Sequence, residues 1–301
     1  MQEAVSLYFK VISRKRLMLA ALALLALLAL LLLPFLHARA LAAFLPAAET
    51  RPLPVIMYHS LLKESDRWGP YTISPSLLEK DIIYLKTQGY TFVSMAEIID
   101  FVTGDGDLPE KPVLLTLDDG NLNNLLYLPE ILARQEVPAL ISVVGEYTDI
   151  FTLQEDRNPS YAYMSWTDLK EFSENPRVEI ANHSYYFHHM GARQGSMRKK
   201  GEAKRDWLAA LHSDTMAMQT ALAERCGLSP RVYTYPYGKI SSGSDDALRA
   251  MGFEATLSCA ERVTILKKGD ADTLFSLGRY NRPANIGTEQ FFSKIFKEVS
   301  K

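Results

Sequence analysis

The chain has 301 residues, a formal net charge of −2 and 48% apolar residues. A chain of this length and composition forms one or two folded domains, which excludes a disordered or low-complexity protein. The near-neutral charge argues against a nucleic-acid-binding protein, which would carry a basic excess. The two cysteines exclude a disulfide-dense scaffold and a cysteine-rich zinc module.

The first predicted element is a membrane-spanning helix over residues 17–36. This run of twenty residues holds no charged or hydrogen-bonding side chain, and a helix of that length spans about 30 Å, the hydrocarbon thickness of a bilayer. Four of the five basic residues among the first forty precede it. We therefore expect residues 1–16 in the cytoplasm, residues 37–50 as an extracytoplasmic tether, and the rest outside the cell membrane. A cleaved signal peptide is the alternative, although its apolar run is usually shorter.

From residue 51 to residue 301, short apolar runs alternate with amphipathic segments. The runs that predict strands are 54–58, 90–94, 112–117, 138–144, 178–181, 232–236, 253–258 and 274–278. The segments that predict helices are 75–88, 95–102, 125–134, 166–174, 202–225 and 288–299. This alternation indicates a parallel sheet covered by helices, and seven or eight such units favour one barrel-like α/β domain.

Two aspartates, Asp118 and Asp119, follow the strand predicted at 112–117 and precede a glycine. Active sites of parallel α/β folds lie at the C-terminal ends of strands. Carboxylates are costly at such a place unless a metal or another partner compensates them. An ordinary Asp-Asp-Gly turn is the structural alternative.

Two histidines, His183 and His188, follow the strand predicted at 178–181. If the strand ends meet in a barrel, Asp119 and both imidazoles can bind one ion. Three ligands leave positions open for water and substrate, as in catalytic rather than structural sites. The five-residue step does not lie on one helical face, so we expect a loop. Mixed carboxylate and imidazole ligands suit Zn²⁺, with Co²⁺, Ni²⁺ and Fe²⁺ as alternatives.

Taken together, the segments resemble the polysaccharide deacetylases of the NodB-homology type, carbohydrate esterase family 4. Residues 116–120 look like the first motif of that family, residues 183–188 like the second, and residues 235–238 like the third. Residues 55–60 resemble the N-terminal strand of the branch that acts on poly-β-1,6-N-acetylglucosamine. The resemblance implies a distorted (β/α)7 barrel, a divalent metal, and hydrolysis of N-acetyl groups on an extracellular N-acetylglucosamine polymer.

The resemblance also implies individual roles. Asp119, His183 and His188 would be the metal ligands, and Asp118 would be the general base. The backbone amide of Tyr237 would bind the oxyanion. The residues expected to contact the polymer are Tyr235, Pro236 and Trp166, of which the tryptophan fits a place in the core equally well.

One departure from the family concerns the arginine that orients the general base. The third motif usually carries an arginine two residues before its proline, where this chain has Thr234. Arg279 and Arg282, near the end of the chain, are the candidates to replace it.

A second departure concerns the general acid. The family usually supplies it from a histidine late in the chain, but no histidine follows His212. Because the first and last strands of a barrel are neighbours, we predict that His59 is the acid, as in the exopolysaccharide branch. His189 is the alternative.

Other substrates and another functional class remain open at this point. Peptidoglycan and chitin oligomers are alternative substrates, although no wall-binding repeat is visible. A catalytically inactive carbohydrate-binding relative is disfavoured by the intact aspartates and histidines. We expect a monomer anchored in the cell membrane, in which Cys226 and Cys259 could pair outside the cell.

Overall fold

The computed structural model describes residues 18–19, 21–25, 27–33 and 49–300. The chain divides into two units, Met1–Ala48 and Glu49–Lys301. The described residues of the first unit are helical. None of the helices in the described ranges is long and apolar enough to cross a membrane. The predicted tail 1–16, nearly all of the tether and six residues of the predicted span 17–36 lie outside the described residues.

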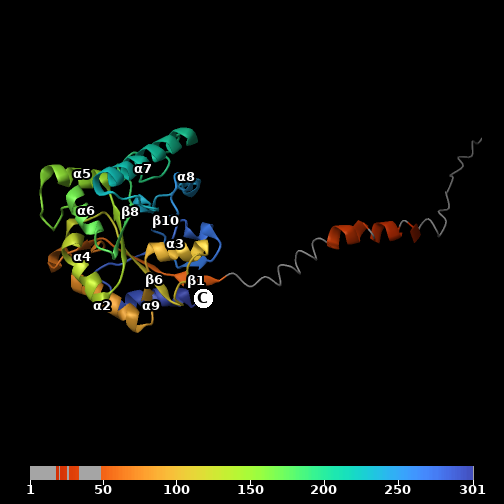
Figure 1. Ribbon diagram of the computed structural model, residues 1–301, viewed down its shortest axis with the longest axis horizontal. Coiled ribbons are helices and arrows are strands. Elements are labelled where there is room, and N and C mark those ends of the chain that lie inside the picture. Colours follow the sequence, from red (N-terminus) through yellow and green to blue (C-terminus); the bar gives the residue numbers. More distant parts are fainter. Residues whose placement is uncertain (1–17, 20, 26, 34–48, 301) are drawn as a thin grey trace, which may run out of the picture. The chain divides into compact units, whose positions relative to one another are not determined.

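Parallel strands form the centre of the second unit (Figure 1). Their order is β10-β9-β8-β7-β6-β2-β12, with β5 also paired to β6. The bounds are β2 Val55–Tyr58, β5 Thr91–Phe92, β6 Pro112–Leu117, β7 Ala139–Val143, β8 Val178–Asn182, β9 Val232–Thr234, β10 Ala255–Leu257 and β12 Tyr280–Asn281. A single parallel bridge between Leu257 and Leu277 links β10 to the segment that leads into β12. The two ends of the row therefore meet at one point, which gives an incomplete barrel.

The strands are apolar because both of their faces are covered. Every residue of β6 and of β7 is buried. Side chains alternate across a strand, so Val113 and Leu115 of β6 join one hydrophobic cluster while Leu114 joins another. Each leucine buried in this way stabilises the fold by about 1.5–3 kcal/mol relative to an exposed one.

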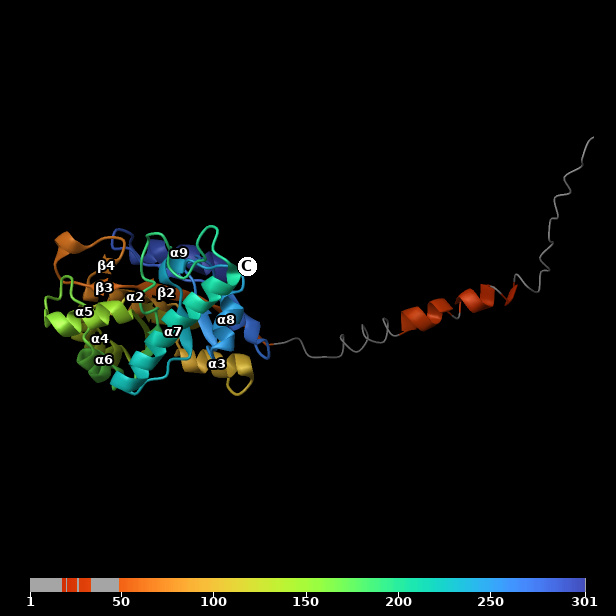
Figure 2. The same ribbon diagram turned by 90° about the horizontal axis from the view of Figure 1, so that it is seen from above.

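Helices surround the strands (Figures 1 and 2). Their bounds are α2 Pro75–Thr87, α3 Met95–Thr103, α4 Leu122–Gln135, α5 Gly145–Gln154, α6 Trp166–Ser173, α7 Lys204–Cys226, α8 Ser244–Ala250 and α9 Thr288–Val299. The sequence signals for two helix starts are confirmed. The Ser74 hydroxyl accepts a hydrogen bond from the Leu77 amide at 3.0 Å, and Ser94 with Glu97 forms a capping box.

Some elements differ from the prediction. The prediction missed helices α5 and α8. It also missed two strand pairs: β1 (Thr50–Leu53) pairs antiparallel with β11 (Thr264–Lys267), and β3 (Ser60–Leu61) pairs parallel with β4 (Thr72–Ile73). Because β1 belongs to this unit, the unit begins at Glu49, two residues before the predicted boundary. The predicted strand 274–278 is wrong: Ser276 has a left-handed φ of 56°, which interrupts an extended chain, and β12 begins at Tyr280.

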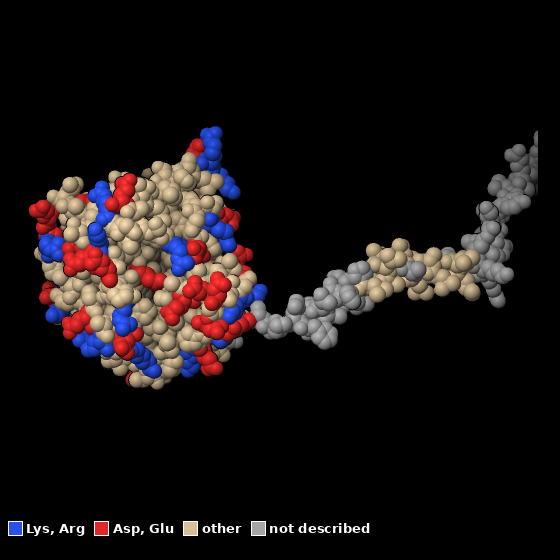
Figure 3. Space-filling model, in the orientation of Figure 1, with Lys and Arg blue, Asp and Glu red and all other residues tan. Residues whose placement is uncertain are grey.

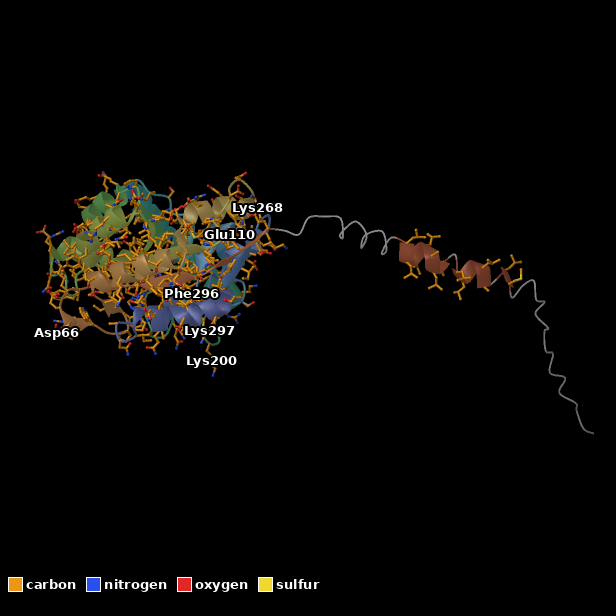
Figure 4. The ribbon with its side chains drawn as sticks, turned by 90° about the horizontal axis from the view of Figure 1, so that it is seen from below. Asp66, Glu110, Lys200, Lys268, Phe296 and Lys297 are labelled. Atoms are coloured by element: carbon orange, nitrogen blue, oxygen red, sulfur yellow. The ribbon has the colours of Figure 1, made fainter. Side chains whose placement is uncertain are left out.

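Charged side chains are spread over the surface. Lys and Arg are interspersed with Asp and Glu on the face shown in Figure 3. Residues 193–205, which follow the two histidines, are rich in Lys and Arg. There Arg193 pairs with Glu202, and Arg198 donates to the Glu202 carbonyl at 2.7 Å. Lys200 points outward (Figure 4).

Candidate active site

The residues predicted to carry chemistry converge at the C-terminal ends of the parallel strands. His59 follows β2, Asp118 and Asp119 follow β6, and His183 follows β8. They border a cavity of about 400 Å³. The residues that line it are Met57, His59, Tyr71, Asp118, Asp119, His183, His188, Tyr237, Cys259, Glu261 and Asn281.

Asp118 is buried and forms a bidentate ion pair with Arg279. The Arg279 Nη1 and Nη2 atoms lie 2.7 and 2.8 Å from the two carboxylate oxygens. Arg279 is fully buried and donates its Nε–H to the Ser258 carbonyl at 2.8 Å. Burial by itself raises the pKa of Asp118, but the charge and hydrogen bonds of Arg279, together with the nearby His183 and His59, outweigh it and hold the pKa below its ordinary value. Asp118 is therefore ionised at neutral pH.

Arg282, the other candidate partner, lies elsewhere. It forms a buried ion pair with Asp81 of α2, with Nε 2.7 Å from Oδ2. The hydroxyls of Tyr58 and Thr288 also donate to the Asp81 carboxylate. Arg282 thus joins α2 to the start of α9, and the suggestion that it orients Asp118 is wrong.

Asp119, His183 and His188 form a cluster of potential ligands. Asp119 Oδ1 lies 3.2 Å from His188 Nε2 and 3.5 Å from His183 Nε2. One atom from each residue falls within 4.8 Å of the others. Burial raises the pKa of Asp119, but the adjacent imidazoles more than offset it, so the pKa is well below its usual range.

The tautomer of His183 explains why this cluster suits a cation. His183 Nδ1 lies 2.8 Å from the Thr234 carbonyl, which can only accept a hydrogen bond, so Nδ1 carries a proton and, in the neutral ring, Nε2 carries a lone pair. Asp119 Oδ1 is buried without a hydrogen-bond partner. A lone pair and an anionic oxygen that face each other repel unless a cation lies between them. One oxygen and two nitrogen ligands therefore fit a divalent metal of the zinc type.

His59 also lines the cavity, at the end of β2, the strand next to β6. The prediction that its strand neighbours the last strand is confirmed, because β2 pairs with β12. Its ring packs edge-on against Tyr71, with centroids 4.9 Å apart, and its Nδ1 is buried without a partner. Burial lowers the pKa of His59 although Asp119 and Asp118 oppose the change. An imidazolium with a lowered pKa is a stronger acid.

His189, the alternative acid, does not line the cavity. Its ring is half exposed, and Nε2 lies 2.8 Å from a carboxylate oxygen of Glu146. The geometry therefore places His59, rather than His189, where a substrate in the cavity can be reached.

Tyr237, whose backbone amide the resemblance implies as the oxyanion donor, also turns its side chain toward the cavity. It occupies the left-handed region (φ 56°) in the short turn Pro236–Gly238. Its ring packs on His188 with centroids 4.4 Å apart, and its side chain lines the cavity. A side chain at Gly238 would come within 2.7 Å of Cys259 Cβ, so only glycine allows this turn to pack against the cavity wall.

The expected sugar contacts of Trp166, Tyr235 and Pro236 are contradicted. Trp166 is buried and donates its indole N–H to Asp149 at 2.8 Å. Tyr235 is buried and donates its hydroxyl to Asp245 at 2.7 Å. Pro236 is also buried, and none of the three lines the cavity. The three side chains belong to the core, and the polar groups of Trp166 and Tyr235 have internal partners there.

Both cysteines are free, so the suggested disulfide between Cys226 and Cys259 is wrong. Cys226 ends α7, whereas Cys259 lies in the cavity wall beside Arg279. Burial raises the pKa of both thiols. Neither is therefore an activated nucleophile.

Sequence reasoning missed Asp214, which shapes the histidine loop. Its carboxylate accepts hydrogen bonds from the amides of Tyr185 and Tyr186 at 3.0 and 2.6 Å. Burial raises its pKa to about 6. The available signal was its place on α7, three residues after Leu211 and four before Met218, on the face that is buried.

Residues 105–256 match the family model for polysaccharide deacetylases. The chain belongs to the polysaccharide deacetylase family. It is therefore a hydrolase that acts on N-acetyl amides. The matched residues include both aspartates, both histidines of the cluster and Tyr237, while His59 and Arg279 lie outside them.

Individual relatives agree with this assignment. The poly-β-1,6-N-acetyl-D-glucosamine N-deacetylase of Escherichia coli strain K12 is 23% identical over 221 residues, which cover 66% of this chain and 32% of the relative. The chain thus spans about a third of that relative's length. The structure of a de-N-acetylase from Aggregatibacter actinomycetemcomitans has 27% identity and a TM-score of 0.66, covering 82% of this chain and 99% of that one. IcaB from Ammonifex degensii, at 24% identity and a TM-score of 0.65, covers 85% and 100% and shares the parallel α/β fold.

Proposed function

We propose that this deacetylase removes N-acetyl groups from a poly-β-1,6-N-acetylglucosamine-type polymer. In this proposal Asp119, His183 and His188 hold a divalent metal ion, for which Zn²⁺ is the first choice. The observation that carries the proposal is that this cluster and Asp118, which is paired with Arg279 behind it, line one cavity. The relatives named for activity on that polymer support the choice of substrate.

In this proposal the metal cluster, Asp118, Tyr237 and His59 each have a task in amide hydrolysis. When bound, the cation would polarise the amide carbonyl and acidify a water molecule. Asp118, kept ionised by Arg279, accepts the proton of the attacking water. The Tyr237 amide donates to the oxyanion that forms on the carbonyl oxygen. His59 donates a proton to the leaving amine, which would otherwise depart as a strong base.

We also propose that the enzyme works outside the cell membrane as a monomer, anchored through residues 17–36 with residues 1–16 in the cytoplasm. The support is the apolar run and the basic residues that precede it. Protease added to intact cells should digest the domain from residue 49 onward. Complete protection of that domain would contradict the orientation.

Acetate release from a panel of oligomers tests the substrate. We expect the β-1,6-linked N-acetylglucosamine oligomer to be hydrolysed fastest, with activity lost on chelation and restored by Zn²⁺. A preference for chitin oligomers or peptidoglycan fragments would move the substrate to those polymers. Binding without acetate release from any of them, with metal present, would indicate an inactive carbohydrate-binding relative.

A further inference from the structure

The two histidines of the cluster are oriented in different ways. His183 directly follows β8, and its Nδ1 is held by the Thr234 carbonyl at the end of the neighbouring strand β9. His188 lies six residues beyond the end of β8, in a loop. Strand carbonyls do not reach it there. An imidazole in a loop can turn either nitrogen toward Asp119 unless another group fixes its tautomer and rotation.

Helix α5 supplies that group, because three consecutive residues of its first turn contact the histidine loop. The contacts are Gly145 N to Ser184 O at 3.1 Å, Glu146 N to Tyr185 O at 2.9 Å, Glu146 Oε2 to His189 Nε2 at 2.8 Å, and the Tyr147 hydroxyl to His188. A Cβ on Gly145 would lie 2.5 Å from the Tyr185 ring. Glycine therefore lets the helix approach closely enough for Tyr147 to reach His188.

The Tyr147 hydroxyl makes two contacts with the same histidine. It lies 3.0 Å from His188 Nδ1 and 3.3 Å from the His188 carbonyl oxygen. A tyrosine hydroxyl has a single hydrogen, and the carbonyl can only accept it. Both contacts are therefore hydrogen bonds only if the hydroxyl donates to the carbonyl and accepts from Nδ1–H.

We propose that Tyr147 is a positioning residue that holds His188 as the Nδ1–H tautomer, with the Nε2 lone pair turned toward Asp119. This inference rests on the proposed ligand set. Hydrogen bonds to the distal nitrogen of a metal-binding histidine typically change metal affinity by about 10–100-fold. Tyr147 acts through His188 and does not itself reach the cation.

Tyr163 provides a matched control. Its ring packs on Tyr147 with centroids 4.5 Å apart and also on Phe151 at 5.5 Å. Among the hydrogen bonds of the described residues, none joins its hydroxyl to His188. Tyr147→Phe and Tyr163→Phe thus each remove one hydroxyl from the same aromatic stack, but only the first removes a bond to the ligand histidine.

The test measures Zn²⁺ affinity of the full-length chain in detergent by competition with a colorimetric chelator. We expect Tyr147→Phe to bind Zn²⁺ about 10–100-fold more weakly than the parent, and Tyr163→Phe to match the parent. The thermal midpoints of both metal-free variants should agree, since a merely structural role would lower that of Tyr147→Phe. Equal affinity in parent and Tyr147→Phe, or equal losses in both variants, would overturn the proposal.

A second measurement uses only the parent protein and so does not depend on whether a variant folds. Nitrogen-15 NMR of the Zn²⁺-loaded parent should show His188 bound to the metal through Nε2 and protonated at Nδ1. Protonation at Nε2 would overturn the role of Tyr147. These outcomes are distinct from failure of the proposed function, in which the parent itself would bind no Zn²⁺ or release no acetate.

Discussion

Replacement of Arg279 by methionine should shift both the stability and the pH profile of the enzyme. Arg279 is fully buried, and it supplies the two side-chain hydrogen bonds to the Asp118 carboxylate, at 2.7 and 2.8 Å. Methionine fills a similar volume but leaves the charged carboxylate of Asp118, which is only 2% exposed, without its partner. Removal of one partner from a buried ion pair costs about 3–5 kcal/mol of unfolding free energy.

The sign of the pH effect follows from the Asp118 pKa. In the parent the folded-state pKa of Asp118 is depressed. The ionised carboxylate therefore stabilises the fold fully above the unfolded-state pKa of about 3.9, and this stabilisation is lost as the pH falls through the folded-state pKa. Without Arg279, burial dominates and raises the folded pKa. The variant therefore loses stability as the pH rises from about 4 through the raised pKa. The difference in unfolding free energy between the parent and Arg279→Met should be largest at neutral pH and smaller in acid.

Catalysis should report the same change. Because Asp118 must be ionised to accept a proton, the acid limb of acetate release should move to higher pH in Arg279→Met. Adding Asp118→Asn should recover part of the lost stability, since no buried charge then remains unpaired.

Arg282→Met is the matched control. It breaks an equally buried pair with Asp81, 2.7 Å long, away from the cavity. It should lower the free energy of unfolding by a similar amount, measured by urea denaturation, yet leave the acid limb in place. The reasoning is refuted if the acid limb of folded Arg279→Met coincides with that of the parent, or if Arg282→Met shifts it equally.

Three further predictions concern the other cavity residues. Asp118→Asn should abolish acetate release while metal content, measured by atomic emission, stays near that of the parent; loss of metal would make Asp118 a ligand. His183→Ala and His188→Ala should each lose bound metal, and full occupancy in both would remove them from the ligand set. His59→Ala should lower turnover by roughly 10²-fold or more with metal retained; near-parental turnover together with a collapse in His189→Ala would transfer the role of acid to His189.

The positions of the aspartates and histidines could be predicted because they depend on local pattern. A buried strand is visible as an apolar run, and the residue that follows it lies at the C-terminal edge whatever the neighbouring elements are. The choice between Arg279 and Arg282 could not be made in this way. The two residues flank β12 and are three apart, so in an extended chain they face opposite sides. The sequence does not show which side is the cavity.

Helix α5 escaped prediction for a related reason. Its sequence, GEYTDIFTLQ, begins with glycine directly after a buried strand and includes three β-branched residues, which favour strands. Only Gly145 and Thr148 are buried, so the apolar stripe that marks an amphipathic helix is missing. The helix forms because its free N-terminal amides bind the carbonyls of Ser184 and Tyr185. Those partners lie about forty residues away in the chain.

Long sequence separation also explains why a motif does not predict how the two histidines are oriented. Their spacing shows that they share one edge of the sheet, but the nitrogen that each turns toward Asp119 depends on the hydrogen bond at its other nitrogen. For His183 the partner is 51 residues away, at Thr234, and for His188 it is 41 residues away, at Tyr147. A chain that kept every motif residue but lost α5 would still bring three potential ligands together. It would hold His188 in two tautomers, only one of which offers Nε2 to a metal.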